Sequence, residues 1–289
     1  MNRLQQFLVN RFWNRTHDHG GSATWSQEPG VRQVINRRIT GDEHQWPVEW
    51  FASKIADGAY PRVLSLGCGT GALERDLASK GLFETAVGLD ISERALELAR
   101  QQARVAGFTH LEYRRADLDR LKLEPNRFEG IFVHQALHHV RDLEGCLAQV
   151  ARALTPGGVF YADEYVGPSR HEWNRQLLRT AEAAFQQLPK AVRRRRRLQL
   201  PVDWRDPSEA VRASEIVRVV GEHLEIVERR DYGGNLLALI HPFLQLDGLD
   251  ASERWQLIAG LLEREDELLA SGAESFYTVL VARSVERAG

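Results

Sequence analysis

Short apolar runs alternate along this chain with longer stretches whose apolar residues recur at helical spacing. The run at residues 62–66 lies between Pro61 and a series of glycines, and it predicts a buried parallel strand. Residues 72–80 then show the helical spacing. Further strands are predicted at residues 85–90, 110–114, 128–134 and 159–162, and further helices at 93–106 and 143–154. This alternation is typical of an α/β fold with a doubly wound parallel sheet.

Helical patterns flank this core on both sides. Before it, residues 31–39 and 46–55 are predicted helices, and Leu4, Phe7, Leu8 and Phe12 suggest a short amphipathic one. After it, helices are predicted at 173–188, 209–220, 236–246 and 252–270, and a sixth strand at 224–227. Ser208 is the expected cap of the helix at 209–220.

We expect one compact domain with four parts. These are a helical preface or lid at 1–55, a cofactor-binding core at 56–166, a helical substrate-side segment at 167–222, and a last part at 223–289. The last part holds the final strands and a helical insert at 233–272. The insert is apolar on one side, and it could form a substrate lid, a dimer face or part of the core.

Glycines occupy every second position after the first predicted strand, at Gly67, Gly69 and Gly71. A strand, a glycine turn and a helix N-terminus together bring bare backbone close to a ligand and aim amide N–H groups at it. We interpret this turn as a cofactor cradle. Gly67, Gly69 and Ala72 also satisfy the relaxed dinucleotide fingerprint, and a glycine turn without any ligand is the remaining alternative.

Acidic residues stand at the ends of the next two strands. Ligands of such sheets bind beyond the carboxyl ends of the strands. There, Asp90 could accept hydrogen bonds from a ribose diol, although Asp90 or Ser92 could equally cap the following helix. Asp117 could accept from an adenine amine or cap a helix. Residues 134–139 and 163–165 follow the fourth and fifth strands at the same edge.

The composition of the 289 residues is ordinary for a soluble globular protein, with 43% hydrophobic and 27% charged residues and a net charge of −2. This charge gives no general attraction to nucleic acid. Cys68 and Cys146 are the only cysteines, so no disulfide framework is expected and a cytoplasmic location is the default. No stretch reads as a signal peptide or as a membrane span.

Two polar clusters have alternative interpretations. His17, Asp18 and His19 could bind a metal, but no further ligand cluster accompanies them, so we expect a solvated loop and no metal. Residues 193–197 are five consecutive arginines. They form either a solvated face or a clamp for a phosphate or carboxylate of the substrate.

Five sequence pieces in order point to one family. They are LSLGCGTG, GLDIS, RRADL, FEGIFVHQALHHV and LTPGGVF, within residues 60–162. With them the chain resembles the class I S-adenosylmethionine-dependent methyltransferases of the small-molecule kind. The resemblance implies a seven-stranded, mostly parallel sheet whose seventh strand is antiparallel, for which residues 277–283 fit.

The resemblance also assigns the cofactor site. It implies that the glycine turn meets the methionine and ribose parts of the cofactor, that Asp90 holds the ribose, and that Asp117 accepts from the adenine amine. The full set of implied cofactor residues is Gly67, Cys68, Gly69, Gly71, Asp90, Ile91, Asp117, Leu118, His134 and Gln135. Ser65 departs from the family, because many members carry an acidic residue there.

Methyl transfer to a hydroxyl needs a group that removes the acceptor's proton, because the cofactor supplies only the methyl. His138 and His139 follow the fourth strand and are the candidate bases, with Glu164 next; packing roles are the alternative. The stretches DEYVGPSRHEW, DPSEAVRASEIV and DYGGNLLALIHPF are similar to a bacterial subgroup associated with glycans and secondary metabolites.

We therefore expect a methyltransferase acting on a hydroxyl of a small molecule, sugar-like or possibly anionic, with S-adenosylmethionine as cofactor and S-adenosylhomocysteine as product. A homodimer is possible. The alternatives are a catalytically silent cofactor-binding subunit, an N- or C-methyltransferase, and, more distantly, an NAD-dependent oxidoreductase.

Overall fold

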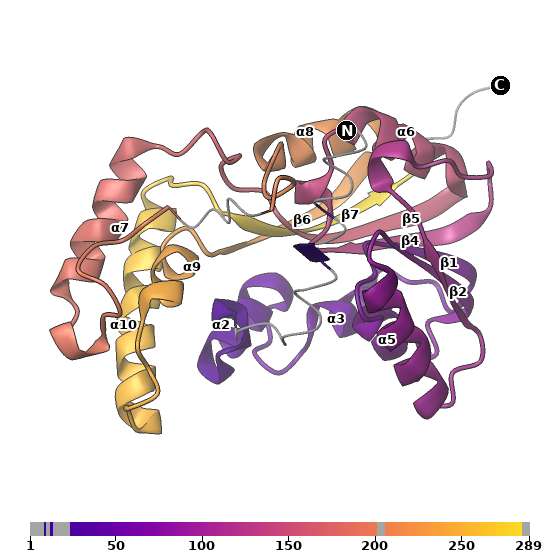
Figure 1. Ribbon diagram of the computed structural model, residues 1–289. Coiled ribbons are helices and arrows are strands. Elements are labelled where there is room, and N and C mark those ends of the chain that lie inside the picture. The colour runs from indigo at the N-terminus through magenta and orange to yellow at the C-terminus, as the bar shows by residue number, and fades with distance from the viewer. Residues whose placement is uncertain (1–8, 10–11, 14–23, 201–205, 285–289) are drawn as a thin grey trace.

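The computed structural model describes residues 9, 12–13, 24–200 and 206–284 (Figure 1). A seven-stranded sheet with the order β3-β2-β1-β4-β5-β7-β6 forms its centre. The strands are β1 (Tyr60–Leu66), β2 (Phe83–Asp90), β3 (Leu111–Arg115), β4 (Phe128–His134), β5 (Leu154–Tyr165), β6 (Glu225–Gly233) and β7 (Tyr277–Arg283). β7 is antiparallel to both of its neighbours, and the other neighbouring pairs are parallel. The predicted fold class is confirmed.

Helices cover both faces of the sheet. They are α2 (Pro29–Thr40), α3 (Pro47–Lys54), α4 (Ala72–Ser79), α5 (Glu93–Val105), α6 (Leu143–Ala153), α7 (Arg175–Gln187), α8 (Ile216–His223), α9 (Leu237–Ile240) and α10 (Ala251–Ala270). Single 3₁₀ turns are η1 (Trp25–Gln27), η2 (Leu118–Arg120), η3 (Leu137–His139), η4 (Lys190–Val192), η5 (Ala213–Glu215) and η6 (His241–Phe243).

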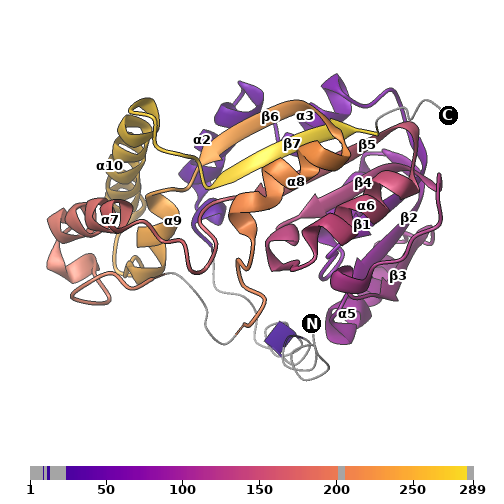
Figure 2. The same cartoon turned by 90° about the horizontal axis from the view of Figure 1, so that it is seen from above.

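The apolar runs of the strands are continuous because both faces of the sheet are buried. In β1, Val63 joins the cluster that includes residues of α2 and α3, whereas Leu64 and Leu66 join the cluster that includes α6 and α8. Figures 1 and 2 show these two helix pairs on opposite sides of the sheet. A strand covered on both faces cannot alternate polar and apolar residues, which is why the pattern predicted the strands.

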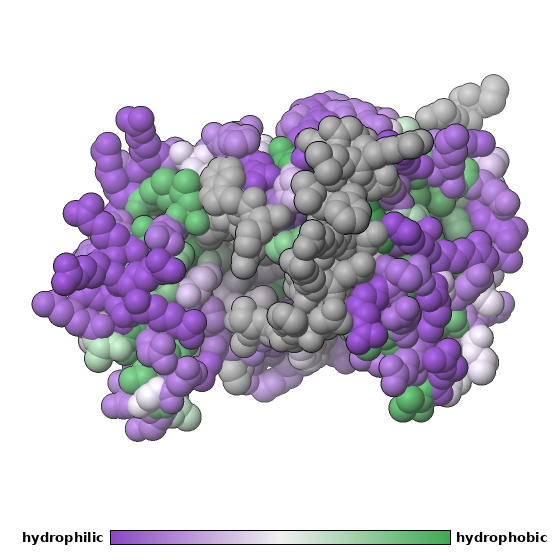
Figure 3. All heavy atoms as spheres, in the orientation of Figure 1, coloured by the Kyte–Doolittle hydropathy of each residue, from purple (hydrophilic) through white to green (hydrophobic). Residues whose placement is uncertain are grey.

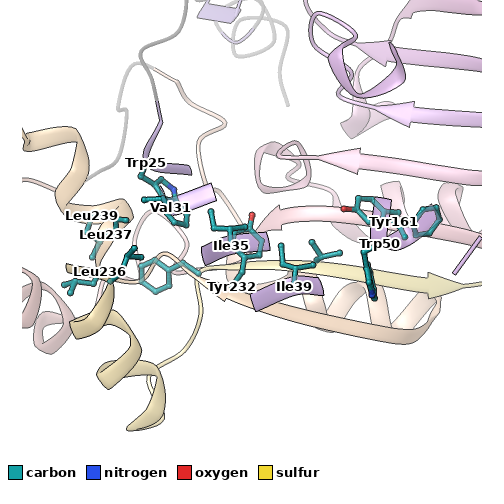
Figure 4. Close-up of a cluster of buried hydrophobic side chains, with 14 of the residues drawn as sticks. Trp25, Val31, Ile35, Ile39, Trp50, Tyr161, Tyr232, Leu236, Leu237 and Leu239 are labelled. Atoms are coloured by element: carbon teal, nitrogen blue, oxygen red, sulfur yellow. The ribbon is translucent and has the colours of Figure 1, made fainter. Parts of the chain in front are cut away.

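The N-terminal helices and the insert share one core. Figure 4 shows Trp25 of η1 and Val31 and Ile35 of α2 packed near Tyr232 of β6 and Leu237 of α9. α7, α9 and α10 gather at one end of the molecule, as Figures 1 and 2 show. Burying a large apolar side chain contributes about 1.5–3 kcal/mol. This cluster therefore holds segments that are far apart in the sequence to one another.

A buried carboxylate fixes the start of the insert. Glu265 of α10 is fully buried and accepts hydrogen bonds from the backbone N–H groups of Gly234, Leu236 and Leu237, each at 3.0 Å. Arg38 of α2 donates to the same carboxylate at 2.8 Å. Breaking such a buried pair by removing one partner costs about 3–5 kcal/mol. α2, α10 and the end of β6 are thereby tied together.

Some predicted boundaries were wrong for identifiable reasons. The fifth strand begins at Leu154 rather than at 159, because Leu154 pairs with Phe128 across a register shift. The helix predicted at 236–246 ends early at Ile240, where Pro242 supplies no backbone N–H and the chain continues as η6. The sixth strand extends to Gly233 because it pairs with the full length of β7.

The helix predicted at 209–220 forms only from Ile216 onward, and Ser208 caps nothing. Ser208 bonds locally instead: its amide and its hydroxyl both donate to Asp206 Oδ1, at 2.8 and 2.6 Å. Such side-chain turns compete with helix formation. Arg170 donates to the carbonyl of Pro207 at 3.0 Å, and it holds this segment as a loop.

Several predictions concern residues outside the described ranges. Leu4, Phe7 and Leu8 of the suggested first helix lie there, as do His17, Asp18 and His19.

In the face shown in Figure 3, hydrophilic side chains dominate and the hydrophobic ones form separate patches. Within the described part of the chain, no helix combines the length and the apolarity that crossing a membrane requires.

Candidate functional site

The glycine turn after β1 has a backbone that other residues rarely adopt. Gly67, Gly69 and Gly71 have φ angles of 66°, 51° and 76°. A Cβ at Gly67 would stand 2.3 Å from the Cβ of Ala136, so Gly67 is also too close to the loop after β4 for a side chain. The turn therefore presents bare backbone to the space beyond the sheet.

A cavity of about 340 Å³ lies beyond the carboxyl ends of the parallel strands. Of the ten predicted cofactor residues, it is lined by Gly67, Cys68, Gly69, Asp90, Ile91, Asp117, Leu118, His134 and Gln135. Gly71 is not among the lining residues. It precedes α4, where a Cβ would lie 2.4 Å from the hydroxyl oxygen of Tyr113, so the closeness of Tyr113 explains the glycine.

Asp90 braces the turn. Its Oδ2 accepts from the N–H of Gly69 and its Oδ1 from that of Ser92, both at 2.8 Å. Ser92, rather than Asp90, caps α5 by accepting from the N–H of Ala95 at 3.2 Å. The carboxylate at the end of β2 thus joins the glycine turn to the wall of the cavity.

Asp117 has the capping role that the sequence left open, and it also lines the cavity. Its carboxylate accepts from the N–H of Asp119 at 3.1 Å and caps η2. Burial raises the pKa of Asp117, and the N–H of Asp119 opposes that rise. Leu118 and Ile91 supply apolar surface to the same cavity.

The sequence analysis missed Glu74. Glu74 lies in the first turn of α4, is fully buried, and stands beside Ser65, the position where many family members are acidic. Burial raises its pKa to about 7, against the opposing effect of the Ser65 hydroxyl. Its position three residues before Leu77, on the buried face of α4, was a signal that could have found it.

His138 and Glu164 form a buried pair. His138 Nδ1 is hydrogen-bonded to Glu164 Oε1, and Glu164 Oε2 accepts from the N–H groups of Ala136 and Leu137 at 2.8 and 2.7 Å. Burial opposes a charge on the imidazole, but the charge and hydrogen bond of Glu164, together with the charges of Glu209 and Asp206, outweigh it, and the pKa of His138 is raised. Glu164 is not among the residues that line the cavity, so we treat it as a positioning residue.

His139 lies beside His138 but faces the first cavity. Its Nδ1 is 3.4 Å from Ser208 Oγ and 3.5 Å from Asp206 Oδ2. Burial, together with the charge on His138, holds the pKa of His139 well below its ordinary value. The two rings are 4.0 Å apart between centroids. One imidazole of the pair thus favours the charged form and the other the neutral form.

Gln135 has an unusual backbone conformation that its contacts with β5 hold in place. Its φ is 53°, unusual outside glycine, and its N–H donates to the carbonyl of Asp163 at 2.9 Å. Its side chain donates to the same carbonyl at 3.3 Å. His134 is half-exposed, with Nε2 3.6 Å from Asp163 Oδ2.

A second cavity of about 270 Å³ adjoins the first at Gln135, which lines both. Its walls come from segments far apart in the sequence. The lining residues are Thr24, Trp25, Gln135, His138, Tyr165, Trp173, Glu209, Ala210, Ala238, Leu239, His241, Pro242, Phe276 and Tyr277. Val211 N–H donates to the carbonyl of His138 at 3.1 Å and keeps the loop of Glu209 over the histidines.

Two histidines and a carboxylate meet between the cavities. Ligand atoms of His138, His139 and Glu209 lie within 4.8 Å of one another, so they could hold a metal ion. Sequence patterns did not indicate this group, because Glu209 is distant along the chain from the histidines.

The arginines at 193–197 line neither cavity. Arg193 stacks over Phe185 of α7 at 5.8 Å, and Arg194 N–H donates to the carbonyl of Phe243 at 2.9 Å. Residues 194–197 are exposed. Of the two interpretations given above, these contacts favour the solvated face.

Comparisons with known proteins agree with this geometry. Residues 64–162 match the family model of a methyltransferase domain. The ubiquinone biosynthesis O-methyltransferase of Methylocella silvestris is 31% identical over 134 residues, 46% of this chain and 49% of that protein. The sterol 24-C-methyltransferase of Aspergillus fumigatus is 33% identical over 106 residues, 36% of this chain and 28% of that protein. This chain thus spans less than half the length of these curated relatives.

The fold of this chain is also similar to that of solved methyltransferase structures. The structure of geranyl diphosphate C-methyltransferase from Streptomyces coelicolor superimposes with a TM-score of 0.59 and 14% identity, covering 97% of this chain and 98% of that chain. Residues 64–162 are therefore a methyltransferase domain, and the sheet has the class I Rossmann-like arrangement. The resemblance that the sequence motifs indicated is confirmed.

Proposed function

We propose that this chain is an S-adenosylmethionine-dependent methyltransferase that methylates a hydroxyl group of a small molecule. The observation that carries the proposal is the meeting of two cavities at Gln135 and the His138–His139 pair. One cavity is lined by the glycine turn, the acidic strand ends and His139, and the other is lined by His138 and the flanking segments. A donor and an acceptor can meet only where two such sites adjoin.

The first cavity fits the cofactor. Bare backbone at Gly67 and Gly69, carboxylates at Asp90 and Asp117, and apolar Ile91 match a ligand with a ribose, an adenine and an amino acid part. Two of the solved methyltransferases with a similar fold hold S-adenosylmethionine or S-adenosylhomocysteine. When bound, this cofactor supplies a methyl group on a positively charged sulfur.

His138 is the group we assign to the acceptor's proton. Its Nδ1 is bonded to Glu164, which leaves Nε2 to take the proton of a hydroxyl in the second cavity. The charge of Glu164 stabilises the imidazolium that results. The curated relatives include both O- and C-methyltransferases, so the choice of oxygen rests on this pair.

The flanking segments enclose the acceptor. Trp25 of the preface, Trp173 and Glu209 of the substrate-side segment and Leu239 of the insert all line the second cavity. This supports the lid role for the preface and the insert. No metal is assigned to the histidine pair, because His138 and Glu164 already form a complete proton-accepting pair.

Thermal shift with S-adenosylmethionine, S-adenosylhomocysteine and NAD tests the proposed function. A ligand that binds only the folded state raises the melting temperature in proportion to the logarithm of its concentration. We expect saturable stabilisation by the two adenosyl ligands and none by NAD. Stabilisation by NAD alone, or by no ligand, would contradict the proposal, and binding without turnover of any acceptor would favour a silent subunit.

A further inference from the structure

The second cavity is walled by aromatic rings. Tyr165 packs edge-on against Phe276 at 6.0 Å and 81° and against Tyr277 at 5.3 Å and 67°, and Trp173 packs edge-on against Phe276 at 6.0 Å. Trp25 extends the wall from Tyr277 at 5.2 Å. Aromatic rings pack best against other flat apolar rings, in edge-on or offset arrangements. The shape and surface of the cavity therefore favour a planar ring.

The charge of the cavity disfavours an anion. Among the described residues that line it there is no lysine or arginine, and Glu209 contributes a carboxylate. The polar tips of the wall have protein partners: Tyr165 donates its hydroxyl to the carbonyl of Pro168 at 3.0 Å, and His241 Nε2 is 3.0 Å from Glu28 Oε1. An acceptor bearing a phosphate or carboxylate would meet Glu209, and the His138 imidazolium on the wall is already paired with Glu164.

Trp173 contributes a buried hydrogen-bond donor. The indole Nε1 of Trp173 is buried and has no hydrogen-bond partner within the described residues. Burying such a donor without a partner costs about 1–3 kcal/mol. Because Trp173 lines the second cavity, a rotation of its ring on ligand binding would let a ligand oxygen there accept from this N–H. This points to an acceptor with an oxygen besides the one that is methylated.

We propose that the acceptor is an uncharged phenol: a planar aromatic ring that carries the reacting hydroxyl and a second, uncharged oxygen substituent. This inference rests on the proposed function. In the reaction, the phenol oxygen forms a bond to the methyl carbon, the bond between methyl and sulfur breaks, and its electron pair stays on sulfur. The phenol proton passes to His138 Nε2, so the products are an aryl methyl ether, S-adenosylhomocysteine and a protonated His138.

Acidity separates phenols from other hydroxyls in this site. A phenol such as the tyrosine side chain releases its proton near pH 10, whereas water and similar hydroxyls hold theirs to a far higher pH. Transfer to an imidazole is therefore far less uphill from a phenol. Removing the proton of a sugar hydroxyl with the same imidazole is more uphill, so the site favours a phenol over a sugar.

A matched pair of compounds tests the proposal. We would measure kcat/KM with S-adenosylmethionine for methyl 4-hydroxybenzoate, which is uncharged, and for 4-hydroxybenzoate, its anion, with methyl glucoside as the aliphatic alcohol. The uncharged phenol is expected to be preferred over the other two by at least about tenfold, which corresponds to about 1.4 kcal/mol. Glu209→Gln should reduce the difference in kcat/KM between the ester and the anion. Arg195→Ala, outside the cavity, should leave that difference unchanged.

Trp173→Phe isolates the indole N–H, because it keeps an aromatic ring in the wall. We expect KM for the ester to rise several-fold with kcat little changed. Preference for the anion or the glucoside, or no methylation and no binding of the phenols by a protein that still binds S-adenosylhomocysteine, would overturn the phenol assignment alone. A folded protein that fails to bind S-adenosylhomocysteine would overturn the proposed function as well.

Discussion

His138 and Glu164 share a hydrogen bond in the interior of the protein, and the carboxylate of Glu164 also accepts three backbone N–H groups, from Ala136, Leu137 and Tyr165. The carboxylate is therefore held rigidly at the end of β5, and it fixes which nitrogen of His138 faces the second cavity. A base with a set orientation and a partner for its charge is what proton removal from an acceptor requires.

The pH dependence of turnover follows from this pair. Because Glu164 raises the pKa of His138, the unprotonated base appears only as the pH rises through that raised value. We expect kcat to rise with pH through one ionisation above pH 6.5. In Glu164→Gln this rise in kcat should occur at lower pH, and the maximal kcat should be lower. His138→Gln should reduce kcat by about 10²–10⁴-fold while S-adenosylhomocysteine still binds.

The raised pKa of His138 also makes the stability of the fold decrease as the pH rises. The raised pKa means that the charged pair stabilises the fold fully below the unfolded pKa of 6.5, and that this contribution is lost as the pH rises through the folded pKa.

In the turnover experiment, His139→Gln is the matched control for His138→Gln. If both variants keep full activity, the assignment of a base to this pair is wrong.

Glu74 makes a second contribution to the pH dependence of stability, with the same sign. Its folded pKa of about 7 exceeds its ordinary value of 4.5, so the folded state holds a proton that the unfolded state has lost. Stability therefore falls as the pH rises from 4.5 to 7, by about 3 kcal/mol in all. Glu74→Gln should remove this loss. Urea unfolding between pH 4 and 9 measures it, with the exposed Glu97→Gln as control, and parallel curves for Glu74→Gln and wild type would contradict it.

The glycine turn can be tested by adding one methyl group. Gly67→Ala places a Cβ 2.3 Å from that of Ala136 at a positive φ, whereas Gly58→Ala, also at a positive φ, meets nothing within 4 Å. Gly58→Ala should cost about 1 kcal/mol, from the backbone alone. Gly67→Ala should cost about 1–3 kcal/mol more and should weaken cofactor binding. Equal losses of stability for the two variants would mean that the turn does not approach Ala136 this closely.

Chelation distinguishes a proton-accepting pair from a metal site. His138, His139 and Glu209 could hold an ion, but we expect full methyl transfer after dialysis against EDTA. Activity that disappears with EDTA and returns with a divalent cation would reassign these three side chains. Elemental analysis of the purified protein provides an independent check.

The sequence predicted most of the sheet because parallel strands buried on both faces leave continuous apolar runs, and glycines mark where they end. Nine of the ten predicted cofactor residues line one cavity, since the carboxyl ends of neighbouring strands meet at one edge. These features depend on local pattern and on one topology.

What the sequence could not supply depends on contacts between distant residues. The bond between His138 and Glu164 joins two strand ends, and the second cavity draws on Trp25, Trp173 and Phe276, which no periodicity connects. Local pattern predicts a helix cap at Ser208, whereas its hydroxyl bonds to Asp206 instead. Side-chain turns and non-local packing decide such places, whereas local pattern decides strands.

Calorimetric titration of S-adenosylhomocysteine into wild type, Asp90→Asn and Asp90→Ala tests the central claim most directly. Asp90→Asn keeps an oxygen that can accept from Gly69 N–H but loses the charge, and Asp57→Ala, outside the cavity, is the control. We predict one site per chain, weaker binding in Asp90→Asn, and loss of measurable binding in Asp90→Ala. Equal affinity in all four folded proteins, or no binding to wild type, would contradict the assignment of this cavity to the cofactor.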